Sequence, residues 1–116
     1  MTTHPERLSF ADWARLPGLW SGRVEGQRFG TEVTVLFVAL DQPGSGPKLH
    51  VHPYDELFII RRGRARYTIG DEVIEAGEGD ILFGPAEVPH RFEVLEAPFE
   101  STDIHLSERW IQIDLE

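Results

Sequence analysis

The chain of 116 residues contains no cysteine. Disulfides, thiolate nucleophiles, thiolate-bound zinc and iron–sulfur clusters are therefore excluded, which leaves histidine and carboxylate side chains as the strong metal ligands. The absence of cysteine agrees with a reducing compartment. The chain also has no apolar run long enough to span a bilayer, and its opening residues, MTTHPERLSF, lack the features of a signal peptide. We therefore expect a cytoplasmic protein with no membrane partner.

Positive charge is scarce. The chain has 20 acidic and 11 basic residues, which gives a formal net charge of -9. Nucleic acids and anionic membranes are bound by clustered lysine and arginine, so we expect no nucleic-acid partner. One local cluster, Arg62, Arg64 and Arg66, would share one side of a hairpin with nearby glutamates, and this pattern favours a solvated, cross-paired surface.

The length suits a single domain, and a hydrophobic content of 41% is enough for one core. We expect residues 1–30 to form an N-terminal segment that packs on the barrel or on a dimer partner, and residues 31–116 to form the barrel domain. Within the first part, Ser9 and Asp12 can cap a short helical turn that ends at Pro17 and Gly18.

The remainder of the chain consists of short strand-like runs separated by turn residues. Gly70 and Asp71 are typical of a tight hairpin turn. Many short strands with regular turns predict an all-β sandwich or barrel. The expected strands cover residues 32–40, 48–51, 56–62, 64–69, 72–76, 81–83, 91–95, 99–106 and 110–115.

Several of these strands are apolar on both faces. In the run 32–40, Val35 and Phe37 point one way while Leu36 and Val38 point the other. In a small isolated barrel one face of each strand is exposed to solvent and should be polar. Because both faces are apolar here, the outer face must be covered. The N-terminal segment can cover part of it, and we favour a homodimer because one short segment is too small to cover the whole.

The stretch with the clearest chemistry runs from residue 50 to residue 56. His50 and His52 lie two apart on a strand and so project from the same face. Pro53 ends this strand, and Glu56 begins the next one beside it. His90, on a later strand, can supply a fourth ligand. Three neutral imidazoles and one carboxylate suit a divalent transition metal.

The spacing of these residues resembles the first motif of the cupin superfamily. It runs as Gly44, five residues, His50-x-His52, three residues, Glu56, six residues and Gly63. Every defined position of that motif is matched.

A second stretch resembles the second cupin motif, with Gly79, five residues, Pro85 and then His90. Two positions depart from the family pattern: Glu87 stands where glycine is usual, and Val94 stands where asparagine is usual. Neither is a metal ligand in cupins, so these departures concern the local turn more than the site.

The resemblance implies a jelly-roll barrel, also called a double-stranded β-helix, with a metal deep inside and a substrate cavity that opens at one end. His50, His52, Glu56 and His90 would hold one divalent transition metal ion, such as Fe, Mn, Ni or Zn. A degenerate cupin without metal is the alternative, but such a protein usually has lost a ligand histidine.

Other residues near this site permit two interpretations each. His105 shares a strand face with Asp103 and Ser101, and could act as a general base whose tautomer Asp103 fixes, or could be an ordinary buried or surface histidine. Tyr54 could donate a hydrogen bond near the metal or lie at a strand edge. Four phenylalanines could line an apolar cavity or fill the core; they are Phe37, Phe58, Phe83 and Phe92. The remaining histidine, His4, is expected to be exposed.

These features favour an enzyme that acts on a small organic molecule. A redox-active metal would suit a dioxygenase, and a Lewis-acidic metal would suit an isomerase, lyase or cyclase. The alternative is a non-catalytic, metal-dependent binding or sensor protein. The substrate cannot be read from the sequence, because it depends on the walls of the cavity.

Overall fold

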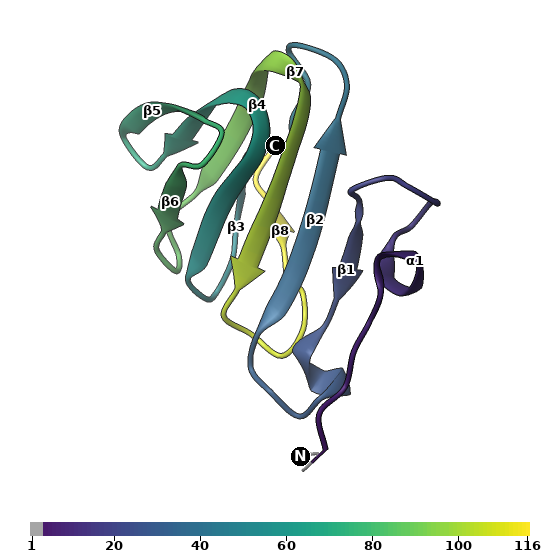
Figure 1. The fold of residues 1–116 in the computed structure, drawn as a ribbon. Coiled ribbons are helices and arrows are strands. Elements are labelled where there is room, and N and C mark those ends of the chain that lie inside the picture. The colour runs from purple at the N-terminus through teal and green to yellow at the C-terminus, as the bar shows by residue number, and fades with distance from the viewer. Residues whose placement is uncertain (1–3) are drawn as a thin grey trace.

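The computed structural model describes residues 4–116 as a curled antiparallel sheet with very little helix (Figure 1). This confirms the predicted all-β fold. No helix within residues 4–116 is long and apolar enough to cross a membrane. The elements are α1 (Phe10–Trp13), β1 (Gly22–Val24), the 3₁₀ helix η1 (Gly26–Arg28), β2 (Thr34–Leu40), β3 (His50–Val51), β4 (Glu56–Ile69), β5 (Glu72–Gly77), β6 (Ile81–Gly84), β7 (His90–His105) and β8 (Ile113–Asp114).

Strand β7 is the centre of the sheet. One edge of β7 pairs with β4 along most of its length, while the other edge pairs with β2 and, at its start, with β3. β4 in turn carries β5 and β6. Because both long strands bend, the sheet curls back on itself, so that the half that contains β2 lies over the half that contains β3 (Figure 1).

The long strands β4 and β7 correct the prediction of separate shorter strands. Residues 56–62 and 64–69 belong to one strand that runs through Gly63, where the pairing with β7 shifts register. Gly63 has a φ of +79°, and a Cβ there would lie 2.5 Å from the carbonyl oxygen of Glu96. A glycine is therefore needed for a bulge that bends the strand without ending it.

The N-terminal segment covers part of the outer face of the sheet. Ser9 and Asp12 form the predicted capping box, although α1 ends already at Trp13. The Trp13 ring stacks on Phe37 of β2 at a centroid distance of 3.6 Å. Strand β1, which was not predicted, pairs antiparallel with β2. The N-terminal residues therefore lengthen the sheet as well as covering it.

The apolar core occupies one end of the interior. A group of buried polar residues occupies the other end, nearest β3 and the start of β4. The core cluster contains Phe58, Ile60, Ala65, Tyr67, Ile69, Ala76, Phe92, Val94 and Phe99. The buried polar residues are Thr34, His50, His52, Glu56, His90, Ser101, Asp103 and His105.

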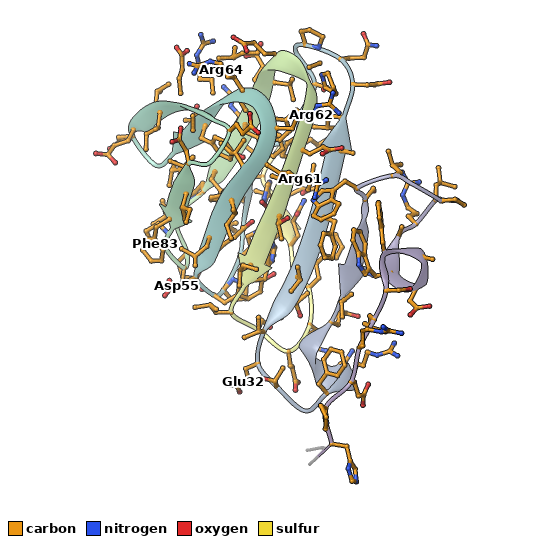
Figure 2. All side chains as sticks on the ribbon, viewed as in Figure 1. Glu32, Asp55, Arg61, Arg62, Arg64 and Phe83 are labelled. Carbon is orange, nitrogen blue, oxygen red and sulfur yellow. The ribbon has the colours of Figure 1, made fainter. Side chains whose placement is uncertain are left out.

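The arginines of β4 lie on the outside, where Figure 2 labels Arg61, Arg62 and Arg64. Arg64 and Arg66 both lie near the Glu75 carboxylate, at 3.4 and 3.5 Å. The cross-paired surface expected from the sequence is thus present for these two arginines. Such exposed ion pairs contribute little to stability.

The turn before β7 contains a strained residue. Glu87 has a φ of +67° and is exposed, and its amide donates a hydrogen bond to the carbonyl oxygen of His52 at 2.9 Å. A residue with a Cβ pays about 1–2 kcal/mol in this left-handed conformation, whereas glycine does not. The departure from the cupin pattern at this position therefore costs stability.

Replacing Glu87 with glycine is expected to raise the free energy of unfolding by about 1 kcal/mol, because it removes this strain. Urea unfolding followed by circular dichroism measures the change. Ala86→Gly in the same turn is the control, and it should lower stability because glycine gains nothing from a conformation that alanine already adopts. If both variants were equally destabilised, the account of strain at Glu87 would be wrong.

Candidate metal centre and ligand cavity

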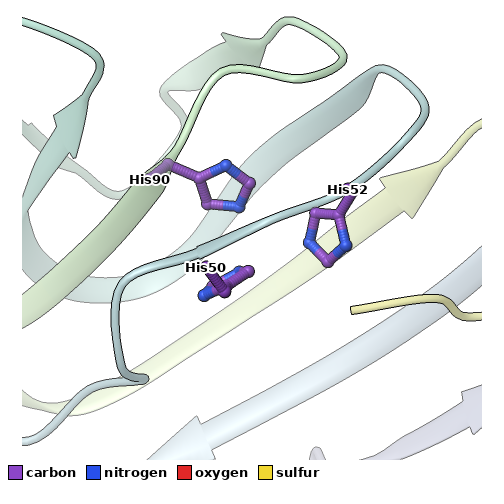
Figure 3. A group of neighbouring side chains, drawn as sticks. All are labelled: His50, His52 and His90. Carbon is purple, nitrogen blue, oxygen red and sulfur yellow. The ribbon is translucent and has the colours of Figure 1, made fainter. Parts of the chain in front are cut away.

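Three histidines meet at the polar end of the interior. His50 lies on β3, His52 follows that strand, and His90 begins β7 directly opposite His50 in the register. One ring nitrogen from each lies within 4.8 Å of the others, and all three side chains are buried. Figure 3 shows the three rings gathered around a common space. The spacing of two residues brings the rings of His50 and His52 together as predicted, and the pairing of β3 with β7 adds the ring of His90.

Hydrogen bonds to backbone carbonyl groups orient each ring. His50 Nδ1 lies 2.6 Å from the oxygen of Lys48, and His52 Nδ1 lies 2.6 Å from the oxygen of Ile111. His90 Nδ1 makes a longer contact of 3.4 Å with the oxygen of Val88. A carbonyl oxygen only accepts, so the proton of each neutral ring sits on Nδ1. Each Nε2 then presents a lone pair, as metal-binding histidines do.

Glu56, the first residue of β4, brings a carboxylate against these rings. Its Oε1 lies 3.2 Å from His52 Nε2 and 3.3 Å from His90 Nε2. With the protons on Nδ1, lone pairs face one another across these short distances, and neither Glu56 Oε1 nor His90 Nε2 has a hydrogen-bond partner. A cation between them would satisfy all of these atoms. The four residues therefore fit a divalent metal.

Burial and the neighbouring charges set the protonation states that a metal needs. Burial lowers the pKa of His50 and so favours its neutral form. Burial alone would raise the pKa of Glu56, but hydrogen bonding to the carboxylate, first of all from His105, outweighs this and holds the pKa below its usual range. A neutral imidazole and an ionised carboxylate are the forms that bind metal.

His105, at the end of β7, uses both of its ring nitrogens. Its Nε2 lies 3.0 Å from Glu56 Oε2, and its Nδ1 lies 2.7 Å from the hydroxyl of Tyr54. Since the ionised carboxylate only accepts, Nε2 carries the proton and Nδ1 accepts one from Tyr54. The expectation that Asp103 fixes the tautomer of His105 is therefore wrong, because Tyr54 and Glu56 do so.

Tyr54 is in turn held by the C-terminal part of the chain. Its hydroxyl oxygen accepts a hydrogen bond from the amide of Ile111 at 3.1 Å and lies 3.0 Å from the carbonyl oxygen of the same residue. That carbonyl also orients His52. One peptide segment thus positions both a candidate ligand and the network behind Glu56. Its contribution had no sequence signal, because it comes from backbone atoms.

A cavity of about 330 Å³ opens beside the candidate metal centre. Phe58 and Phe92 line it, whereas Phe37 lies under Trp13 on the outer face and Phe83 is exposed. Its walls are mostly apolar. The lining residues are Leu36, Val38, Leu40, Gly46, Pro47, His50, His52, Glu56, Phe58, His90, Phe92, Asp103, His105 and Gln112.

The curled sheet, with its histidine-rich site in the interior, defines a small β-barrel protein that can hold a metal. The family model of the cupin domain matches residues 37–104, more than half of the chain. The chain therefore belongs to the cupin family.

Among curated proteins, the chain is similar to oxalate decarboxylase of Bacillus subtilis, with 32% identity over 89 residues, or 64% of the chain and 23% of that enzyme. It is also similar to a dimethylsulfoniopropionate lyase of Ruegeria pomeroyi, with 29% identity over 76 residues, or 65% of the chain and 38% of the lyase. The chain thus spans well under half of the length of either enzyme.

A solved structure of the B. subtilis oxalate decarboxylase, studied for its Mn(II) centres, aligns with a TM-score of 0.74 and 25% identity. The alignment covers 81% of the chain and 27% of that structure.

Proposed function

We propose that this cupin is a metal-dependent enzyme that binds one divalent transition metal through Nε2 of His50, His52 and His90 and through Oε1 of Glu56. Its substrate would be a small organic acid or a related molecule that fits the apolar cavity. The observation that carries the proposal is the convergence of three buried histidine rings at the wall of this cavity, where His90 Nε2 and Glu56 Oε1 lack protein partners.

A bound divalent ion would supply Lewis-acid chemistry or, for a redox-active metal, oxidation chemistry. The residues of the chain prepare the site for either. Apolar walls such as Leu36 and Phe58 lower the effective dielectric constant beside the site, which strengthens electrostatic interactions there. His105 holds Oε2 of Glu56, so that Oε1 is the oxygen aimed at the histidines. These bonds support a positioning role for His105, and its action as a general base stays a prediction.

The relatives support the same class of chemistry. One is named as a decarboxylase of oxalate, a small organic acid, and structural work on it concerns Mn(II). Another is named as a lyase of dimethylsulfoniopropionate. Both names describe reactions of small carboxylates, which a metal centre inside this cavity could hold and polarise.

To test the proposal, purified protein would be loaded separately with Fe(II), Mn(II), Ni(II) and Zn(II), and metal content measured by mass spectrometry. A panel of small carboxylic acids would then be followed by NMR and by an oxygen electrode. We expect about one metal per chain and conversion of at least one acid.

The outcome also separates the alternatives. Oxygen uptake only with a redox-active metal would indicate a dioxygenase, whereas turnover with Zn(II) would indicate Lewis-acid catalysis. Ligand binding without turnover would indicate a sensor, and a protein that retains no metal would refute the proposal.

We also propose that the protein acts as a homodimer through the outer face of the sheet. The register places Phe83, Leu57, Ile104 and Val35 side by side across β6, β4, β7 and β2. The N-terminal segment reaches only one end of this face, through Trp13 on Phe37. Phe83 remains 54% exposed and projects from the sheet edge in Figure 2. A second copy of the face would cover this apolar row.

Phe83→Glu is expected to weaken the dimer by about tenfold or more, because it places a charge in an apolar contact. Sedimentation velocity over a range of protein concentrations measures the dissociation constant. Val73→Glu is a matched control, since Val73 is 62% exposed on β5 but lies outside the row. A wild-type protein that stays monomeric at high concentration would refute the dimer.

A further inference from the structure

One acidic residue lines the cavity without contributing to the candidate metal centre. Asp103 lies on β7, two residues before His105, and its neighbours in the register are Phe58 on β4 and Leu36 on β2. It lines the same cavity as Glu56 but is buried, with only 4% of its surface exposed. Asp103 lies at the level of Phe58, whereas His105 lies at the level of Glu56.

Asp103 has no protein partner for its buried oxygen. Oδ1 makes no hydrogen bond, although buried polar atoms in proteins nearly always make one. Leaving such an atom unpaired destabilises the folded protein. Burial, together with the charge of Glu56, raises the pKa of Asp103, so the side chain favours the neutral acid, which can both donate and accept a hydrogen bond. The wall of the cavity therefore contains a carboxyl group whose Oδ1 has no hydrogen-bond partner in the protein.

The position of Asp103 defines what that partner must be. Two residues along a strand span roughly 6.6 Å, so Asp103 lies about this far along the wall from the level of Glu56 and His105. The wall at the level of Asp103 is apolar, because Leu36 and Phe58 flank Asp103 on the two neighbouring strands. A ligand that reaches both levels needs a polar head, a short apolar body and a second polar group.

We infer that Asp103 is a specificity-determining residue that hydrogen-bonds a hydroxyl group on a small carboxylic acid whose carboxylate binds at the four-residue site. This inference rests on the proposed metal-dependent function and adds the class of ligand. A two-carbon acid is too short to reach both levels. The cavity instead suits hydroxy acids in which several carbons separate the hydroxyl from the carboxylate.

The inference can be tested with two matched series of probes on metal-loaded protein. One series is acetate, propionate, butyrate and pentanoate, and the other is their ω-hydroxy counterparts. Isothermal titration calorimetry measures the dissociation constant of each acid. At one chain length in the longer half of the series, we expect the hydroxy acid to bind about tenfold tighter than its partner without the hydroxyl, since one well-made hydrogen bond to a buried group is worth about that factor.

Substitutions of Asp103 then test whether this residue causes the preference for the hydroxyl group. Asp103→Leu should abolish the preference for the hydroxyl while keeping the affinity for the plain acids, and Asp103→Asn, which can still donate and accept, should retain part of it. Glu100→Gln is the control, because Glu100 lies on the same strand but pairs with Arg61 and does not line the cavity. It should keep the full preference.

Two failures can be told apart because metal content is measured in the same samples. Metal-loaded protein that binds both series equally, or an Asp103→Leu variant that keeps the preference, would overturn the inference and leave the metal centre intact. Protein without metal would overturn the proposed function. In that case the inference would survive only if the hydroxyl preference persisted and still depended on Asp103.

Discussion

Replacing His52 with alanine should weaken metal binding by about 100-fold or more. The ring supplies one of four candidate ligand atoms, and even changes behind a metal ligand cost 10- to 100-fold in typical sites, roughly. Glu56→Gln should have a comparable effect, because it removes the negative charge that faces His52 and His90. Metal content after dialysis, measured by mass spectrometry, reports the loss.

Substitutions of two other histidines serve as controls for this loss of metal binding. His4→Ala changes an exposed residue far along the chain from the site and should leave metal content unchanged. His105→Ala should retain metal but bind it roughly 10- to 100-fold more weakly, because Glu56 loses the bond that orients its second oxygen. Equal metal content in wild type and His52→Ala would contradict the assignment of the ligands.

Asp103→Leu should make the metal-free protein more stable at pH 7, by about 1–3 kcal/mol in the free energy of unfolding. Most substitutions of buried residues destabilise a protein, so a gain would be unusual. It is expected here because leucine removes an acid with an unpaired oxygen from an apolar wall. Ser101→Ala provides a comparison on the same strand face.

The gain should depend on pH in a defined direction. In the unfolded chain the carboxyl group ionises near its ordinary pKa of 3.8, whereas folding raises the pKa of Asp103. Above pH 4 the unfolded state therefore gains free energy from ionisation that the folded state lacks, so this residue lowers stability as pH rises. The difference between Asp103→Leu and wild type should be smaller near pH 4, where only the unpaired oxygen contributes, and larger at pH 7. Thermal unfolding across this range measures it, and a gain that shrinks with rising pH would rule out this explanation.

The sequence allowed the fold class and the meeting of the four candidate ligands to be predicted, because both depend on local patterns. The alternation of side chains in β3 places His50 and His52 on one face, and the turn after Pro53 returns the chain at Glu56. Strand limits were less predictable. Gly63 is typical of a turn, yet pairing with β7 carries β4 through it as a bulge.

The surroundings of the site were harder to predict, because they depend on contacts between distant segments. The carbonyl oxygen of Ile111 orients His52 across 59 residues of sequence. Every residue has a backbone carbonyl group, so the residue type at position 111 does not indicate this contact. The sequence likewise could not show that Tyr54, and not Asp103, is the neighbour of His105. A cytoplasmic location and the identity of the metal stay predictions.

The bond from Ile111 to the ring of His52 also has a consequence for the order of events during biosynthesis. The chain is made from the N-terminus onward, so His50, His52 and Glu56 exist well before residue 111 has been added. Until that residue folds back, the imidazole of His52 lacks the carbonyl that fixes its tautomer, and Tyr54 lacks the amide bonded to its hydroxyl. Metal uptake would then be a late step, and a nascent chain would carry the right side chains without yet competing strongly for the ion.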